Sequence, residues 1–347
     1  MSNRGATGLA VGALAAGIAV GAAAGRLAER RLVGRPRETA ERVSLTALAN
    51  LPPGEQSVVM TDDQVDLWVE TSGPVGSAAT IVAVHGLALT SDSWVFQREL
   101  LAQERWVTFD QRGHGRSGVG GSGRNTVEQL ADDLRVVIDA AAPDGPLVLL
   151  GHSMGGMAVM ALAEQHPDVF ERVGGVVLAS TSASELVNES FGLPERLTRW
   201  GRTLAPEVLR RVGTSPPDSK LRRLVAESDL THILTRQYSF DSPVPAGVVE
   251  NVQRMIVGTD PDVLADFLRQ LDEFDGRPGL LRMGQRPVQV LMGESDRITP
   301  PVHGERIAAA VRGGRLIVVP GAGHLLQLER PELVADAVRV VLAEVGA

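Results

Sequence analysis

The sequence predicts an α/β fold with a mostly parallel central sheet, helices on both faces and a helical cap insertion. Short apolar segments alternate with segments of helical periodicity along most of the chain. Gly-rich turns follow several of the apolar segments, as expected where strands lead into helices. The 347 residues are 44% apolar and 22% charged, so the chain is long enough to bury a large core.

The predicted strands are short and apolar, which is typical of parallel strands covered on both faces. Val65–Glu70 alternates apolar and polar residues and is predicted to be an edge strand. The other predicted strands are Thr80–Val84, Arg105–Asp110, Leu147–Leu150, Gly175–Ser180, Val288–Met292 and Arg315–Val319. The last three of these are predicted to be buried strands.

Two helices are predicted between these strands with particular clarity. One begins after Thr126, because Gln129 follows three residues later as in a capping box. Its apolar face has helical spacing. That face consists of Val127, Leu130, Leu134, Val137 and Ile138. A turn at Gly151–Gly155 leads into the second helix, Met157–Gln165, which ends before Pro167.

The segment 182–283 lacks strand patterns and is predicted to be a helical cap. Apolar residues at helical spacing indicate three helices. They are Leu193, Leu197 and Trp200, then Leu221, Leu224 and Val225, then Val263, Leu264, Phe267 and Leu271. An insertion at the carboxyl end of a strand lies where open α/β sheets bind ligands. The core is therefore predicted to comprise residues 57–181 and 284–347.

Residues 1–35 form a separate segment, and residues 36–56 are predicted to be a polar linker. The segment Gly5–Gly25 carries no charged residue and is long enough to form a membrane-spanning helix. The arginines that follow favour a cytoplasmic location for the rest of the chain. Ala22–Ala24 supports a cleaved signal peptide, and hence secretion, as one alternative. A disordered Ala/Gly tail on a soluble cytoplasmic protein is the other.

Composition excludes several classes of protein. The net charge of −8 and the pI near 5.5 argue against a nucleic-acid-binding protein. The chain has no cysteine, which excludes disulfides, thiolate nucleophiles and Cys-ligated zinc. No H-E-x-x-H or G-x-G-x-x-G pattern occurs at a suitable place, so no metal or other cofactor is expected. The oligomeric state is not predicted.

Gly151-His152-Ser153-Met154-Gly155 matches the G-x-S-x-G pattern of a nucleophile elbow. An apolar strand precedes it and a helix follows it. A sharp turn would hold Ser153 in a strained conformation, and the flanking glycines would let neighbouring chain segments pass closely. The N-terminus of the helix would then direct its free N–H groups towards developing negative charge.

A serine becomes a strong nucleophile only with a base and an orienting acid. His324, which follows the last predicted strand, is the candidate base. Asp296 is the candidate acid, with Glu294 and Asp110 as rivals. The backbone N–H groups of Leu87 and Met154 would form an oxyanion hole. A capping or loop histidine is the alternative interpretation of His324.

The order of these motifs resembles the α/β-hydrolase superfamily from about residue 55 to residue 345. The motifs are His85-Gly86, Asp110–Ser117, Gly151–Gly156, Gly293–Asp296 and Gly323-His324. The stretch Leu89–Gln97, with Trp94, looks like that of lid-bearing esterases and cofactor-free haloperoxidase-like members. The resemblance implies that Asp110–Ser117 is structural.

The expected function is cleavage of a small apolar carboxylic ester through an acyl-enzyme on Ser153. Family members that open epoxides or remove halide use a carboxylate nucleophile, which the serine excludes. The same triad would also serve a C–C bond hydrolase or a cofactor-free perhydrolase or haloperoxidase-like enzyme. A non-catalytic ligand-binding protein with the same fold is the alternative of another class.

Overall fold

The computed structural model describes residues 51–121, 123–184, 186, 210 and 235–346. These residues form an eight-stranded sheet in the order β1-β2-β4-β3-β5-β6-β7-β8. The two strands at the β1 end are antiparallel to their neighbours, and the remaining strands are parallel. The strands are β1 Glu55–Met60, β2 Asp66–Ser72, β3 Thr80–Val84, β4 Arg105–Phe109, β5 Leu147–His152, β6 Val173–Ala179, β7 Val288–Gly293 and β8 Gly314–Val319.

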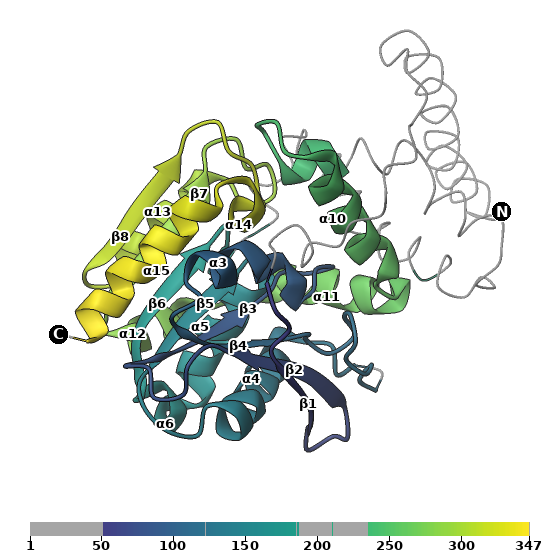
Figure 1. The fold of residues 1–347 in the computed structure, drawn as a ribbon. Coiled ribbons are helices and arrows are strands. Elements are labelled where there is room, and N and C mark those ends of the chain that lie inside the picture. Colours follow the sequence, from purple (N-terminus) through teal and green to yellow (C-terminus); the bar gives the residue numbers. More distant parts are fainter. Residues whose placement is uncertain (1–50, 122, 185, 187–209, 211–234, 347) are drawn as a thin grey trace, which may run out of the picture.

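Helices cover both faces of the sheet, as the sequence predicts (Figure 1). The helices that follow the strands in the first half are η1 Ser91–Trp94, α3 Val95–Leu100, α4 Val127–Ala141, α5 Met154–Gln165 and α6 Pro167–Phe170. The remaining helices of the described residues are α10 Ala246–Gly258, α11 Pro261–Glu273, α12 Arg277–Met283, α13 Pro301–Ala310, α14 Leu326–Glu329 and α15 Pro331–Val345.

Alternation along the strands separates the core into two layers. In β3, Val82 and Val84 join the cluster that contains α4, α5 and α12. The intervening Ile81 and Ala83 face the opposite cluster, which contains α15 and Trp94. Both faces are therefore apolar, and this explains why the strand has no polar alternation.

The two edges of the sheet differ from the prediction. The predicted edge strand Val65–Glu70 lies within β2, which is almost fully buried because β1 covers it. The true edge strand β1 was missed, since its mostly exposed residues do not alternate and its apolar run is only the three residues Val58–Met60. The segment Arg315–Val319 was predicted to be buried, but β8 forms the other edge. There Ile317 is 39% exposed, because no further strand covers it.

The helices begin close to their predicted positions. Thr126 caps α4, and its side chain accepts a hydrogen bond from the Gln129 N–H at 3.1 Å. The Gln129 side chain does not complete the capping box; it contacts Arg124 and Asp132 instead. Helix α5 starts at Met154, three residues earlier than predicted, directly after the elbow.

The described part of segment 182–283 is helical and contains no strand. Helix α10 packs through Val248 and Val252 against Leu325, near the carboxyl ends of the strands. Helices α11 and α12 bury Phe267 and Leu280 in the main core beside α5. The apolar positions predicted between residues 193 and 225 lie outside the described residues.

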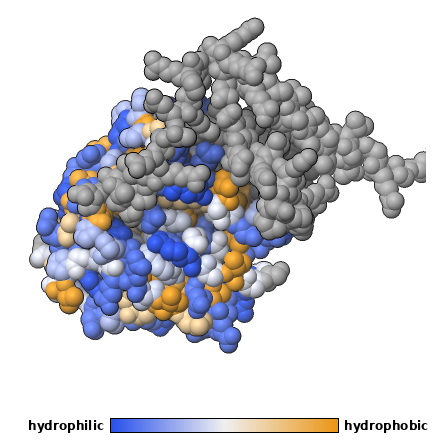
Figure 2. All heavy atoms as spheres, turned by 45° about the vertical axis from the view of Figure 1, so that its right-hand side comes forward, coloured by the Kyte–Doolittle hydropathy of each residue, from blue (hydrophilic) through white to orange (hydrophobic). Residues whose placement is uncertain are grey.

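No helix of the described residues is long and apolar enough to cross a membrane. The predicted anchor Gly5–Gly25 lies outside them. On the face turned towards the viewer in Figure 2, hydrophobic residues are scattered among hydrophilic ones.

Candidate active site

The candidate site lies where the strand order reverses, at the carboxyl ends of β3 and β5. The chain leaves β3 towards β4 on one side, whereas β5 lies on the other side of β3. Connections that diverge in this way leave a crevice outside the strand ends. Leu87 follows β3 and Ser153 follows β5, so the topology brings these two distant residues to the same crevice.

Ser153 occupies a strained turn between β5 and α5. Its φ of 51° and ψ of −120° lie in a region that residues with a side chain rarely adopt. The Ser153 N–H donates to the carbonyl of Ala179 at 3.0 Å, and the Ser153 carbonyl accepts from Thr181 Oγ1 at 2.7 Å. These bonds on both sides hold the strained conformation, and the side chain remains only half-buried.

The loop after β3 lies directly against this turn. A Cβ atom added to Gly86 would come within 2.6 Å of His152 Nδ1 and 3.2 Å of Ser153 Cβ. Only glycine permits this approach. The adjacent Leu87 is partly buried, and Met154 is the first residue of α5, where backbone N–H groups have no intrahelical acceptor. Both predicted oxyanion donors therefore flank the Ser153 turn.

Asp296 and His324 form a buried pair. Asp296 Oδ2 lies 2.8 Å from His324 Nδ1, and both residues are at most 5% exposed. The other carboxylate oxygen, Oδ1, accepts from the N–H groups of Ile298 at 2.8 Å and Thr299 at 2.9 Å. Thr299 Oγ1 donates to Oδ2 at 2.7 Å. The carboxylate is thus fixed by its own turn before it meets the imidazole.

The environment favours the charged form of Asp296. Burial pushes its pKa upwards, but the facing His324 and the hydrogen bonds from His324 and Thr299 hold the pKa below the ordinary value. The rivals are engaged elsewhere. Glu294 is exposed and accepts from the Gly321 N–H, whereas Asp110 is bonded by Ser91 and Arg116. The structure therefore brings Asp296, and neither rival, to His324.

His152 connects the serine turn with the histidine loop. Its Nε2 lies 3.1 Å from the backbone carbonyl of His324, and the two rings lie 4.9 Å apart. Burial lowers the pKa of His152 to about 3, so the ring is neutral at pH 7. Nε2 must then carry the proton and donate to the carbonyl, because a carbonyl only accepts. The residue next to Ser153 thereby holds the backbone of His324.

The sequence analysis did not predict the role of Thr299 or the partner of His152. The Asp296-Arg297-Ile298-Thr299 spacing matches a local turn in which an aspartate accepts backbone N–H groups, so Thr299 could have been found. A histidine inside a Gly-rich turn can hydrogen-bond to backbone, and His152 does so. No local pattern identifies its partner, which lies 172 residues away.

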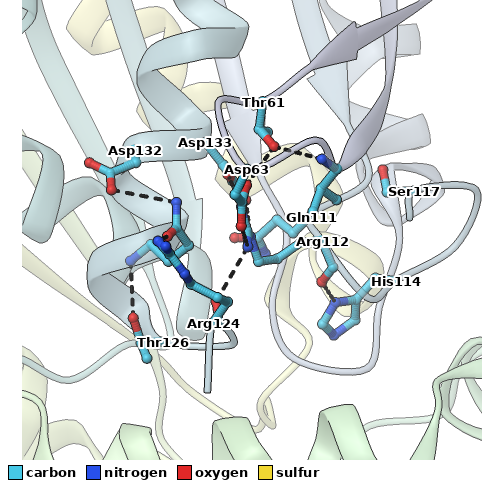
Figure 3. Close-up of polar contacts among 12 residues, drawn as sticks. Thr61, Asp63, Gln111, Arg112, His114, Ser117, Arg124, Thr126, Asp132 and Asp133 are labelled. Carbon is cyan, nitrogen blue, oxygen red and sulfur yellow. Dashed lines mark hydrogen bonds and ion pairs between the residues drawn. The ribbon is translucent and has the colours of Figure 1, made fainter. Parts of the chain in front are cut away.

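A second cluster of buried charges lies around Arg112 (Figure 3). Its Nε and Nη2 donate to the two oxygens of Asp133, each at 2.6 Å. Nη1 donates to Asp63 at 2.9 Å and Nη2 to the other Asp63 oxygen at 3.0 Å. The hydrogen bond from Arg112 holds the pKa of Asp63 well below its ordinary value. This cluster joins the β1–β2 turn to α4.

Within the described residues, no group of three or more His, Asp or Glu side chains is arranged to hold a metal ion. The predicted nucleophile, base and acid are Ser153, His324 and Asp296, and the backbone N–H groups of Leu87 and Met154 are the predicted oxyanion donors. Such a set is suited to acyl transfer.

Comparison with known proteins identifies related enzymes. A bifunctional esterase/perhydrolase of Acinetobacter calcoaceticus is 27% identical over 283 residues, covering 77% of this chain and 92% of that protein. An sn-1-specific diacylglycerol lipase of Mus musculus is 27% identical over 269 residues, covering 76% of this chain and 80% of that protein.

Solved structures share the fold. A thermophilic esterase from Thermogutta terrifontis has a TM-score of 0.64 at 27% identity, over 85% of this chain and 100% of that one. A bromoperoxidase from Bacillus anthracis has a TM-score of 0.67 at 17% identity, over 83% of this chain and 100% of that one. The sequence profile of the alpha/beta hydrolase fold matches residues 79–331. The chain therefore belongs to the α/β-hydrolase family, in agreement with the resemblance found in its motifs.

Proposed function

We propose that the protein is a serine hydrolase that cleaves a carboxylic ester through an acyl-enzyme. The observation that carries this proposal is the buried Asp296–His324 pair, held by His152 against the strained turn of Ser153. A half-exposed serine on a strained turn, beside an acid–base pair, is the arrangement that activates a hydroxyl nucleophile.

In the proposed mechanism, His324 Nε2 removes the proton from Ser153 Oγ as Oγ attacks the ester carbonyl carbon. The carbonyl oxygen becomes an oxyanion and accepts hydrogen bonds from the N–H groups of Leu87 and Met154. The tetrahedral intermediate collapses when His324 gives the proton to the leaving alcohol. Water, deprotonated by His324, then releases the acid and restores Ser153.

Asp296 serves the reaction through its orientation and its charge. Its hydrogen bond to Nδ1 leaves Nε2 as the nitrogen that faces the serine proton. The pKa of Asp296 is held low, so the carboxylate remains ionised and stabilises the imidazolium that forms.

The names of the relatives support an ester substrate and add perhydrolysis as a second candidate. One relative is described as both an esterase and a perhydrolase. Hydrogen peroxide would then replace water in the second half-reaction and release a peracid. The first half-reaction and its residues would be unchanged.

A fluorophosphonate probe and a panel of soluble esters test the proposal on the full chain. We expect covalent labelling at Ser153, and hydrolysis of p-nitrophenyl esters across a series from acetate to palmitate. Adding hydrogen peroxide and measuring peracid distinguishes the perhydrolase. A folded protein that neither reacts with the probe nor turns over any ester would contradict the proposal and favour a non-catalytic binding protein.

A further inference from the structure

Glu329 is a buried carboxylate outside the proposed triad. It lies in α14, a short helix after the His324 loop, and is 6% exposed. Its oxygen Oε2 accepts from the Gly323 N–H at 2.7 Å. Gly323 directly precedes His324, so the carboxylate fixes the backbone on the amino side of the proposed base.

The other oxygen of Glu329 holds a distant segment. Oε1 accepts from the Asp241 N–H at 2.9 Å, from the Ser242 N–H at 2.5 Å and from Ser242 Oγ at 2.7 Å. Asp241 and Ser242 belong to the segment predicted to be the cap and lie just before α10. One carboxylate thus joins the histidine loop to the cap segment.

Neighbouring contacts strengthen the same junction. Arg330 Nη1 donates to Ser242 Oγ at 2.6 Å, and its Nη2 donates to the Gly321 carbonyl at 3.0 Å. The Leu325 N–H donates to the Ser239 carbonyl at 2.9 Å. The acid loop takes part too, since Ser295, next to Asp296, donates through Oγ to the Asp241 side chain at 2.9 Å. The cap segment therefore contacts both loops that carry the acid–base pair.

The chemistry of the junction requires a carboxylate at position 329. All four groups that face it are donors, and only an ionised carboxylate accepts on both oxygens without donating. In an amide of the same shape, the NH₂ group would face an N–H donor on one side. The buried donors on that side would then lose their acceptor.

We propose that Glu329 is a positioning residue that fastens the His324 loop to the cap segment Ser239–Ser242. Through Gly323 it fixes the backbone of the base, and His324 then meets Ser153 and Asp296 in a productive orientation. Loosening this junction would misplace the imidazole, and small displacements of a reacting group are costly to the rate. The proposal rests on the proposed function, because it assigns a positioning role in that reaction.

The test compares Glu329→Gln with Glu332→Gln in the full chain. Glu332 is an exposed residue at the start of α15 and serves as a matched control. We expect Glu329→Gln to lower kcat for a soluble short-chain ester by about tenfold. KM should change less than about twofold, since the change acts on the reacting geometry rather than on substrate binding. Glu332→Gln should match the wild type in both constants.

Amide hydrogen exchange provides a measurement that is independent of catalysis. In Glu329→Gln, the segments that contain Gly323-His324 and Ser239–Ser242 should both exchange faster than in the wild type. If Glu329→Gln does not fold, Ser242→Ala removes one of the four donors. That variant also removes the acceptor of Arg330 Nη1, and it should lower kcat by about threefold, less than Glu329→Gln because three donors keep their carboxylate.

The outcomes separate the junction from the proposed function. An active wild type with a Glu329→Gln variant of unchanged kcat would overturn the positioning role, even if that variant were less stable. Unchanged exchange at both segments would overturn the junction itself. An inert wild type would contradict the proposed function, while faster exchange at both segments in the variant would still support the junction.

Discussion

Two of the buried polar clusters among the described residues invite comparison, one at the Asp296–His324 pair and one at Arg112. They are similar in several respects. Both join segments that are distant in the sequence, and both have contacts between 2.6 and 3.0 Å. In both, at least one residue is fully or almost fully removed from water. Burial and ion pairing alone do not distinguish them.

The two clusters differ in whether a nitrogen of the central side chain remains without a hydrogen bond. The Arg112 guanidinium donates four hydrogen bonds to Asp63 and Asp133 and one to the Arg124 carbonyl, so its capacity is filled. Among the described residues, the hydrogen bonds of the His324 ring involve Nδ1 alone. The ring lies 4.9 Å from that of His152, and Ser153 follows His152 on the strained turn. A cluster whose donors are all engaged serves the fold, whereas an unused nitrogen near the proposed nucleophile is available for the proposed chemistry.

Ser153→Ala is expected to have the largest effect of the variants considered, and it acts at the proposed site. It should abolish fluorophosphonate labelling and lower kcat by about 10⁶-fold, because triad members act as a unit. Circular dichroism should show an unchanged fold. Ser182→Ala is the matched control, since Ser182 Oγ lies 2.8 Å from His303 Nδ1 but the residue is fully buried. Labelling that survives in Ser153→Ala, or that disappears in Ser182→Ala, would contradict the assignment.

Asp296→Asn tests the acid within the same cluster. We expect kcat to fall by about 10⁴-fold with the fold intact, because an amide favours the wrong tautomer of His324. Glu294→Gln is the control, since Glu294 is exposed and contacts the Gly321 N–H. Steady-state kinetics on a short-chain ester decide. A large loss in Glu294→Gln with little loss in Asp296→Asn would transfer the role to the rival.

Arg112→Met tests the second cluster. In contrast to the variants above, it should lower the stability and leave the activity of the folded protein nearly unchanged. It leaves Asp133, which is 1% exposed, without its cation, and the free energy of unfolding should fall by about 3–5 kcal/mol. Activity per folded molecule should remain within a few-fold of the wild type. Denaturant unfolding and active-site titration measure the two effects. A double variant with Asp133→Leu should recover part of the lost stability, because it removes the unpaired charge.

The effect expected to be smallest at neutral pH concerns His114, which lies beside the Arg112 cluster. Its Nδ1 lies 2.9 Å from the Arg112 carbonyl, and burial lowers its pKa from 6.5 to about 3. The folded protein therefore keeps this ring neutral, whereas the unfolded chain binds a proton below about pH 6.5. The contribution of the neutral His114 ring to the free energy of unfolding is fully present above that pH. It is lost as the pH falls towards 3, by about 1.4 kcal/mol for each pH unit.

His114→Asn keeps a donor near the Arg112 carbonyl and removes the titration. Its free energy of unfolding, measured between pH 7 and pH 4, should fall less steeply than that of the wild type. The buried His85 and His152 also have lowered pKa values, so the wild-type slope contains their contributions as well. Equal slopes in the two proteins would show that His114 does not titrate on unfolding.

Most of the sheet could be predicted because its strands are apolar runs that end in Gly-rich turns. The edges could not, since exposure of β1 and β8 depends on what covers them rather than on local pattern. In the candidate site, the order of Ser153, Asp296 and His324 was readable. The choice between Asp296 and Glu294 was not fixed by spacing, because both follow β7. The turn through Thr299 distinguishes them in the structure.

The partners of Arg112 and Glu329 could not be predicted for a different reason. Asp133 lies 21 residues from Arg112, and Ser242 lies 87 residues from Glu329. Such pairs are brought together by topology. A charged residue in an apolar neighbourhood signals that a partner exists, but the sequence does not say which residue it is.

The positive φ of Ser153 has a consequence for any effort to stabilise this protein. A residue with a side chain in this region carries a conformational penalty of about 1–3 kcal/mol, which glycine would avoid. Directed evolution for heat resistance alone would therefore favour loss of the serine. A selection that screens for turnover as well as for survival at high temperature is needed to keep it.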